Sequence, residues 1–283
     1  MSQAVHKYHY KPKAHTAVAK AVAMVGSGRR VLELGSGPGS MTRLLHQNQC
    51  RVTALERDPE AVRIVAQYCE RVLLCNLDDA NWPTLLPASE KFDVVVATDV
   101  LEHLVDPWHA LQQLHALLTE QGSVVVSLPH VGHNAVVAGL LHGEFNYQSR
   151  GLLDKTHLRF FGIKDVQRLF DDTGYKIVDA DFIIRTPAQT EFASAWRKLS
   201  SAMRMALERN RYGNIYQILV CAVPVSFPGK ALRLEKLRIP DADSGSYSLG
   251  AHGSRVLGFM LSFMNLSTRD KLSAAMRRIG LRL

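Results

Sequence analysis

Cysteine is scarce in this sequence, and the few cysteines it has are not arranged in pairs. The 283 residues include four, with no C-x-x-C spacing among Cys50, Cys69, Cys75 and Cys221. Such pairs are the usual sign of structural zinc or of redox chemistry, so neither is expected. Three of the four lie in apolar stretches typical of a strand or a helix, where a small buried thiol is common. We therefore expect reduced, structural cysteines.

Long apolar runs are also missing. No stretch reaches the roughly 18 residues that a membrane-spanning helix requires, and the N-terminus has no apolar signal region. Integral insertion and secretion are both unexpected, which indicates a cytoplasmic protein. With 47% hydrophobic residues the chain can still bury a sizeable core. One catalytic domain of about 200 residues plus a tail fits its length.

Acidic residues are fewer than basic ones, and the imbalance is concentrated at one end. The chain has 34 Lys and Arg against 26 Asp and Glu, and residues 226–283 hold ten of the basic and four of the acidic residues. Residues 1–225 are therefore almost balanced, whereas a nucleic-acid enzyme is expected to carry a basic patch on its catalytic domain. The charge pattern argues against a nucleic-acid partner and indicates that the tail meets an anionic membrane surface or a partner.

Three glycines spaced two apart mark the stretch around which the chain is organised. Residues 30–40 read Arg-Val-Leu-Glu-Leu-Gly-Ser-Gly-Pro-Gly-Ser, which predicts a strand, a tight turn and the start of a helix. Glycine lets the backbone adopt positive φ and lets a ligand approach the main chain, while the N–H groups that open the helix point at that ligand. The pattern indicates a nucleotide-type pocket.

Two details decide which nucleotide this pocket suits. The spacing is G-x-G-x-G, with Ser40 where the dinucleotide fingerprint G-x-G-x-x-G has its third glycine. Glu33, just before the turn, would repel a pyrophosphate but suits a ligand whose nearby end carries a cationic amino group. S-adenosylmethionine has such an end. The stretch closely resembles motif I of the class I S-adenosylmethionine-dependent methyltransferases.

This resemblance implies a fold, a cofactor and a set of contacts. The implied fold is an α/β, Rossmann-like, doubly wound sheet of seven strands over roughly residues 13–225, with the last strand antiparallel and a C-terminal helical tail after it. S-adenosylmethionine is the implied methyl donor, and S-adenosylhomocysteine is the product. The expected cofactor contacts are Glu33, Gly35, Ser36, Gly37, Gly39, Glu56, Arg57, Asn76, Leu77 and Thr98.

Two of these contacts have specific expected roles. Glu56 ends the second predicted strand seventeen residues after Gly39, close to the ~20-residue offset at which an acidic side chain reaches the two ribose hydroxyls. Asn76 follows the third predicted strand, where relatives usually carry an aspartate that binds the adenine amino group. An asparagine carbonyl can accept the same hydrogen bond, so Asn76 is expected to flank the adenine.

After the fourth predicted strand, the chain from Asp99 to Leu104 reads Asp-Val-Leu-Glu-His-Leu. This segment resembles the region after motif IV in small-molecule methyltransferases, including the ubiquinone-pathway O-methyltransferases, where similar residues are linked to a divalent metal. Asp99, Glu102 and His103 are the candidate metal ligands. Because such groups at a helix start more often act as caps, a metal is the alternative and not the expectation.

A second distinctive stretch, residues 151–162, contains Asp154 and His157 three residues apart. An imidazole oriented by a carboxylate is suited to taking a proton from a hydroxyl as that hydroxyl attacks a methyl group. The D-x-T-H-x-R-F-F pattern resembles one in bacterial methyltransferases that accompany cell-surface polysaccharide assembly. We predict His157 as the general base, Asp154 as its orienter and His103 as the second candidate; the alternative is a purely structural turn.

The two ends of the chain are assigned separate roles. Residues 1–12 form an arm that is a candidate lid, and residues 226–283 form a basic linker and an amphipathic helical tail. In the tail, Ser267 and Asp270 predict a capping box before a helix with arginines near its end. Such a helix predicts peripheral docking on anionic lipid, and packing against the catalytic domain or a twin subunit in a homodimer is the open alternative.

These features together predict an O-methyltransferase that acts on a sugar or on a glycan-linked or lipid-linked small molecule. An oxygen acceptor is favoured because a histidine base is needed only where the attacking group must lose a proton. Two alternatives stay open. One is a metal-dependent O-methyltransferase of quinone-type or natural-product acceptors, and the other is a non-catalytic partner protein that binds S-adenosylmethionine.

Overall fold

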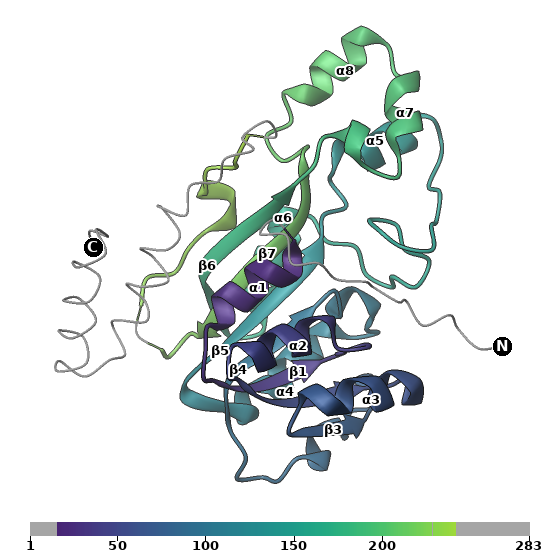
Figure 1. The fold of residues 1–283 in the computed structure, drawn as a ribbon. Helices are drawn as coiled ribbons and strands as arrows, with labels where there is room; N and C mark the ends of the chain where they lie inside the picture. Colours follow the sequence, from purple (N-terminus) through teal and green to yellow (C-terminus); the bar gives the residue numbers. More distant parts are fainter. Residues whose placement is uncertain (1–15, 228, 242–283) are drawn as a thin grey trace, which may run out of the picture. The chain divides into compact units, whose positions relative to one another are not determined.

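The computed structural model describes residues 16–227 and 229–241, and these form a seven-stranded sheet flanked by helices (Figure 1). The strand order is β3-β2-β1-β4-β5-β7-β6. The strands are β1 (Arg30–Leu34), β2 (Arg51–Glu56), β3 (Arg71–Leu74), β4 (Phe92–Thr98), β5 (Leu118–Pro129), β6 (Tyr175–Ile184) and β7 (Ile215–Pro224). Strands β1 to β5 pair in parallel, and β7 runs antiparallel to both β5 and β6. The predicted doubly wound sheet with an antiparallel last strand is confirmed.

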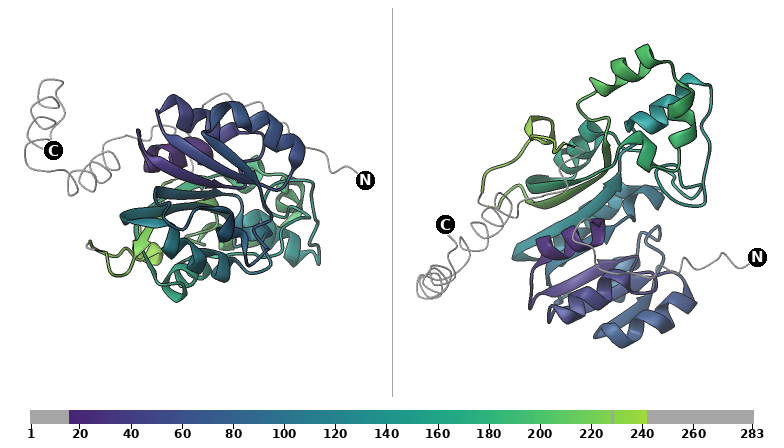
Figure 2. Two further views of the ribbon diagram at one scale, coloured as in Figure 1. Left: turned by 90° about the horizontal axis from the view of Figure 1, so that it is seen from below. Right: turned by 45° about the horizontal axis from the view of Figure 1, so that its top comes forward.

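Helices cover both faces of the sheet, as the apolar strands require. Helices α1 (Ala17–Val25), α2 (Ser40–Gln47) and α3 (Pro59–Val65) lie on one face, and α4 (Pro107–Leu114) and α6 (Ile163–Asp172) lie on the other (Figure 2, left). In β4, five of seven residues are buried because side chains on both faces meet helices. The four cysteines are unpaired, and three of them are buried, as expected. Two apolar layers therefore pack against the two faces of the sheet.

Two long connections carry additional helices beyond the ends of β5 and β6. Helix α5 (Asn134–Leu141) follows β5, and α7 (Ala193–Lys198) and α8 (Ser201–Glu208) lie between β6 and β7. Figure 1 shows the three helices grouped together above the strand ends. We call residues 130–162 and 185–214 the cap. Its two segments are joined by Asn134, which donates to the carbonyl of Leu207 at 2.8 Å and accepts from Asn210 at 3.0 Å.

The position of the cap follows from the strand directions. Strand β6 runs antiparallel to β7, and β7 runs antiparallel to β5, so β6 ends at the same edge of the sheet as β5. The glycine loop that follows β1 lies at this edge as well, because β1 is parallel to the strands beside it. The carboxyl edge of a doubly wound sheet is where ligands bind. The fold therefore brings the cap and the glycine loop to one edge.

The chain continues to pack after β7, in a segment that the sequence assigned to the linker. The N–H of Leu232 donates to the carbonyl of Ile177 in β6 at 2.7 Å. Leu234 is fully buried, and its N–H donates to Gln167 in α6 at 3.0 Å. Residues 229–241 thus protect the exposed edge strand of the sheet.

The remaining predictions for the two ends of the chain concern residues that the structure does not describe. The arm at residues 1–12 and the tail helix that begins near Ser267 lie outside the described residues. In the part of the chain that the structure describes, no helix has the length and apolar character needed to cross a membrane.

Candidate active site

The glycine loop has the backbone geometry that its sequence predicts. Gly35, Gly37 and Gly39 have φ values of 63°, 53° and 86°, a region that glycine adopts without the strain that a Cβ brings. An ideal Cβ at Gly35 would lie 2.8 Å from Cγ2 of Val100, whereas one at Gly37 would meet nothing within 4 Å. The loop is therefore packed against Val100 on one side and open above Gly37, where a ligand can approach the main chain.

Glu56 joins this loop to the end of β2. Its Oε2 accepts a hydrogen bond from the N–H of Gly37 at 2.6 Å, and its Oε1 accepts from the N–H groups of Arg57 and Asp58 at 2.8 and 2.9 Å. The side chain is buried. The predicted ribose-binding carboxylate and the predicted glycine loop are therefore in direct contact, although they are separated by nineteen residues.

Glu33 lies beneath α2 and carries a strongly perturbed carboxyl group. The residue is buried, and the hydroxyl of Thr42 in α2 donates to its Oε2 at 2.6 Å. Burial raises the pKa of Glu33 to about 8; the hydrogen bond from Thr42 opposes this rise, and the nearby Glu56 adds to it. At neutral pH the carboxyl group is therefore mostly protonated until a cation comes close to it.

The remaining predicted cofactor contacts surround the same edge. Ser36 is buried within the loop, and Thr98 is half-buried at the end of β4. Asn76 is exposed just beyond β3, where its Oδ1 accepts from the N–H of Asp78 at 3.2 Å, and Leu77 is half-buried beside it. The structure therefore places these residues at the ends of neighbouring strands. The adenine contact of Asn76 stays a prediction.

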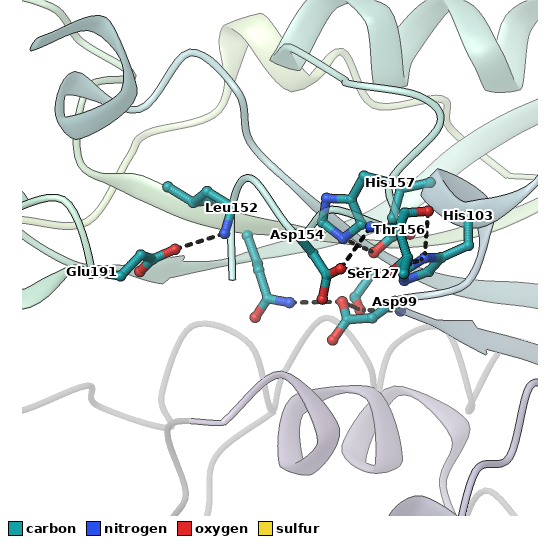
Figure 3. A network of polar contacts seen from close by, with 10 residues as sticks. Asp99, His103, Ser127, Leu152, Asp154, Thr156, His157 and Glu191 are labelled. Carbon is teal, nitrogen blue, oxygen red and sulfur yellow. Dashed lines mark hydrogen bonds and ion pairs between the residues drawn. The ribbon is translucent and has the colours of Figure 1, made fainter. Parts of the chain in front are cut away.

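Asp99 follows β4 in a strained conformation and is held by two neighbouring strands. Its φ is 54°, which is uncommon for a residue other than glycine. Its Oδ1 accepts from the hydroxyl of Ser127 in β5 at 2.9 Å and from the amide of Gln217 in β7 at 2.7 Å (Figure 3). Backbone strain of this kind is typical of functional sites, where the surrounding structure maintains it.

His157 lies beside a buried carboxyl group that comes from another part of the chain. Its Nε2 is 4.0 Å from Oε1 of Glu102, and both side chains are buried. Among the described residues, the carboxyl oxygens of Glu102 have no hydrogen-bond partner. The carbonyl of Glu102 accepts the N–H groups of Leu158 and Arg159 at 2.8 and 3.0 Å. The histidine turn is therefore fixed directly onto the segment that follows β4.

Burial shifts the two groups of this pair in opposite directions. Burial, reinforced by the charge of Asp99, raises the pKa of Glu102 well above its usual range. Burial, reinforced by the neighbouring His103, lowers the pKa of His157 to about 4. His157 is consequently neutral at physiological pH, as a general base must be.

The side chains of Asp154 and His103 both contact Thr156. Oδ1 of Asp154 accepts from the N–H and the hydroxyl of Thr156 at 2.8 and 2.7 Å. Nδ1 of His103 lies 3.1 Å from both the carbonyl and the hydroxyl oxygen of Thr156. Figure 3 shows these side chains gathered around His157, whose ring centre is 4.8 Å from that of His103. The carboxylate of Asp154, predicted to orient His157, thus binds Thr156 instead. Asp154 contacts His157 through the backbone turn, where the N–H of His157 donates to the carbonyl of Asp154 at 3.0 Å.

One group of side chains in the described part of the chain has the geometry to hold a metal ion. Ligand atoms of Glu102, His103 and His157 lie within 4.8 Å of one another. One carboxylate and two imidazoles are a donor set that suits several divalent metals. Asp99, which the sequence placed in this group, is held by Ser127 and Gln217 instead. The buried and unpartnered carboxyl group of Glu102 fits such an ion.

Comparison with known proteins places this arrangement in a family. Residues 6–180 match the model of the family described as methyltransferase domain. The chain is 22% identical over 168 residues to a ubiquinone biosynthesis O-methyltransferase of Coxiella burnetii, covering 58% of this chain and 71% of that protein. It is 28% identical over 125 residues to a trans-aconitate 2-methyltransferase of Shigella dysenteriae, covering 43% of this chain and 48% of that protein.

A solved structure gives the same result for the fold. An S-adenosylmethionine-dependent methyltransferase of Thermotoga maritima matches with a TM-score of 0.50 and 16% identity, over 74% of this chain and 88% of that one. At this identity the likeness concerns the fold and not the acceptor.

Proposed function

The chain belongs to the family of methyltransferase domains and is an S-adenosylmethionine-dependent enzyme, and from this premise we propose that it methylates an oxygen atom of a small-molecule acceptor with His157 as the general base. S-adenosylmethionine is the donor in this proposal, held by the glycine loop and by Glu56. The observation that carries the proposal is the buried pair of His157 and Glu102 at the carboxyl edge of the sheet.

The proposed chemistry is an in-line displacement at the methyl carbon. The acceptor oxygen forms a bond to this carbon while the carbon–sulfur bond breaks, and the electron pair of that bond stays on sulfur to give S-adenosylhomocysteine. The hydroxyl proton passes to the ring of His157. Because the sulfonium is already activated, the protein mainly positions the acceptor and removes its proton.

In this proposal Glu102, and not Asp154 as predicted, is the carboxyl group that assists His157. The imidazolium that forms on His157 lies 4.0 Å from the carboxyl group of Glu102. Burial favours the neutral form of Glu102, but a cation on His157 favours the ionised form, and the carboxylate then stabilises that cation because the buried surroundings screen the charges weakly. Thr156 and Asp154 keep the turn that carries His157 in place.

The acceptor is assigned to a chemical class only. Two relatives are named for ubiquinone biosynthesis and for trans-aconitate, which supports a small molecule whose oxygen is methylated. A sugar or glycan acceptor, which the sequence predicted from residues 151–162, has no support among these relatives. We therefore propose a small hydroxylated or acidic molecule and not a polysaccharide.

A metal-assisted version of the reaction is the second candidate. The group of Glu102, His103 and His157 favours it, since all three would then bind an ion that lowers the pKa of the acceptor hydroxyl. Under our proposal the rate is unchanged after treatment with EDTA. A rate that is lost with EDTA and restored by Mg²⁺ or Mn²⁺ would favour the metal-assisted reaction.

The proposed function is tested by transfer of a labelled methyl group. We expect the purified protein to transfer label from S-adenosylmethionine to an oxygen of a component in a small-molecule extract, with the product identified by mass spectrometry. Label found only on nitrogen or carbon, or no transfer to any component, would contradict the proposal.

A further inference from the structure

The charges of the described residues are separated between two parts of the fold. Residues 16–129, which form the cofactor half, contain nine Lys and Arg against thirteen Asp and Glu. The cap, residues 130–162 and 185–214, contains nine Lys and Arg against four Asp and Glu. An acidic half suits a cationic donor. A cap with an excess of five positive charges indicates that the other ligand of this edge is anionic.

The cations of the cap are mostly not neutralised by the protein. Of its nine Lys and Arg side chains, only Lys198 forms an ion pair with a described residue, at 3.5 Å from Glu144. Arg211 donates to the main-chain carbonyls of Glu235 and Leu237, and no acidic side chain in the described part of the chain pairs with it. The cap therefore keeps most of its positive charge available for an external anion.

Arg185 is a cation of the cap that stacks closely on an aromatic ring. It follows β6, and its guanidinium carbon lies 4.0 Å from the centre of the Tyr216 ring, over its face. Stacking on an aromatic ring fixes the plane of a guanidinium and leaves its N–H groups free to bind a carboxylate or phosphate in a bidentate manner. None of the ion pairs within 4.0 Å among the described residues involves Arg185.

The acidic residue nearest to this stack is engaged with other donors. Glu191 accepts from the hydroxyl of Tyr216 at 3.2 Å and from the N–H of Leu152 at 2.8 Å. Burial raises the pKa of the Tyr216 hydroxyl, Glu191 raises it further, and Arg185 lowers it, so both charged groups face this ring. Among the described residues, Glu191 binds these two donors and forms no ion pair with Arg185.

The stack is connected to the reaction site on both sides. Gln217, next to Tyr216 in β7, donates to Asp99 at 2.7 Å. Glu191 binds Leu152, which lies two residues before Asp154, and Figure 3 shows this contact beside His157. The ring on which Arg185 stacks is thus linked, through Glu191 and through its neighbour Gln217, to segments that surround the general base.

We infer that the methyl acceptor is an anion whose carboxylate or phosphate binds the guanidinium of Arg185. This inference rests on the proposed function and narrows the acceptor to oxygen nucleophiles that also carry an acid group. The stacked guanidinium would orient the acceptor, and the excess positive charge of the cap would attract it. Arg185 is a binding residue in this account and takes no part in the proton transfer.

The test compares two probes that differ by one charge. The affinities of 4-hydroxybenzoate and of the neutral 4-hydroxybenzamide are measured by calorimetry on the full chain saturated with S-adenosylhomocysteine, and inorganic phosphate serves as a competitor. We expect the wild type to bind the acid at least about tenfold more tightly than the amide, since hydrogen bonds to a charged group are worth this much. Phosphate should displace the acid.

Substitutions then assign the effect to one side chain. Arg185→Gln should abolish the preference for the acid, and Arg185→Lys should retain part of it, because lysine keeps the charge but loses the planar fork. Arg197→Gln, at an exposed arginine of the same cap, should leave the preference unchanged. Equal binding of acid and amide by the wild type, no binding of either anion, or a preference that survives Arg185→Gln would overturn the inference.

These outcomes are separate from a failure of the proposed function. If the protein binds S-adenosylhomocysteine and transfers methyl groups but does not distinguish acid from amide, only the anionic acceptor is wrong. If it prefers the acid but transfers no methyl group to oxygen, the proposed reaction is wrong and the anion site stands.

Discussion

Nε2 of His157 lies 4.0 Å from Oε1 of Glu102, and the two side chains are almost completely buried. They come from separate segments, one following β4 and the other within the cap. Together they form a base and an acid group whose pKa values are displaced in opposite directions. Pairs of this kind are found where proton transfer takes place.

The pH dependence of the rate follows from the lowered pKa of His157. The base works only when neutral, and with a pKa of about 4 it is neutral throughout the physiological range. We expect the rate of the methyl-transfer step to stay flat with pH between about 6 and 8 and to fall only as pH approaches about 4. Single-turnover rates across this range test the expectation. An inflection near 6.5, the ordinary value of an exposed histidine, would contradict it.

Glu102 should matter more than Asp154 for the chemical step. Glu102→Gln keeps the size of the side chain but removes a carboxyl group that can ionise when an imidazolium forms beside it, so we expect the single-turnover rate to fall about 10- to 100-fold. Asp154→Asn, which weakens only the contacts to Thr156, should cost less. The affinity for S-adenosylhomocysteine should hardly change in either variant. A larger loss in Asp154→Asn would return the orienting role to Asp154.

Glu33 should make the cofactor-free protein less stable as pH rises. The folded carboxyl group keeps its proton up to about pH 8, whereas the unfolded one releases it near 4.5. Between these values the folded state binds more protons, so the free energy of unfolding decreases with increasing pH. Glu33→Gln removes this effect, and its advantage over the wild type should grow by about 2 to 4 kcal/mol between pH 5 and 8.

Thermal unfolding at several pH values checks this prediction. Glu60→Gln is the matched control, because it removes an exposed carboxylate from α3. Parallel pH profiles of Glu33→Gln and the wild type would show that Glu33 does not retain its proton in the folded state.

Glu56 should be essential for cofactor affinity. Glu56→Ala removes the carboxylate predicted to bind the ribose and also frees the N–H of Gly37. Hydrogen bonds to a carboxylate are worth about 1.5 to 3 kcal/mol, so the Kd of S-adenosylmethionine should rise at least about tenfold. Calorimetry with a folded variant decides the matter. An unchanged Kd would exclude the assigned ribose contact, and tight binding of NAD by the wild type would contradict the choice of cofactor.

The sheet and the cofactor edge could be predicted because their signals are local. The turn of the glycine loop can be recognised from five consecutive residues. The strands are short apolar runs bounded by turn residues. The placement of Glu56 beside the glycine loop agrees with the prediction that both contact the cofactor, since Glu56 ends β2 and the loop follows the neighbouring parallel strand β1. Such features need no knowledge of distant contacts.

The pairing at the base could not be predicted from spacing. Asp154 is three residues from His157, but Thr156 is closer along the chain and takes its carboxylate in a local turn. Glu102 is fifty-five residues before His157, and Gln217 reaches Asp99 only because β7 inserts beside β5. These contacts depend on how the cap folds back onto the sheet.

The separation of charge within the catalytic domain could not be predicted from the sequence either. Residues 1–225 are almost neutral in total, and this total charge gives no indication of an anionic acceptor. The fold divides them into an acidic cofactor half and a basic cap, because two cap segments that are separated by β6 come together at one edge. The separation of acidic from basic residues follows from the topology and cannot be inferred from the total charge.

The central claim is that His157 removes the proton during methyl transfer, and the single-turnover rate of His157→Gln tests it most directly. The measurement uses enzyme saturated with labelled S-adenosylmethionine and an acceptor identified by the extract screen. We predict a rate lowered about 10²- to 10⁴-fold, the usual contribution of a general base, with cofactor affinity nearly intact. A rate within a few-fold of the wild type, in a variant that still binds the cofactor, would contradict the account.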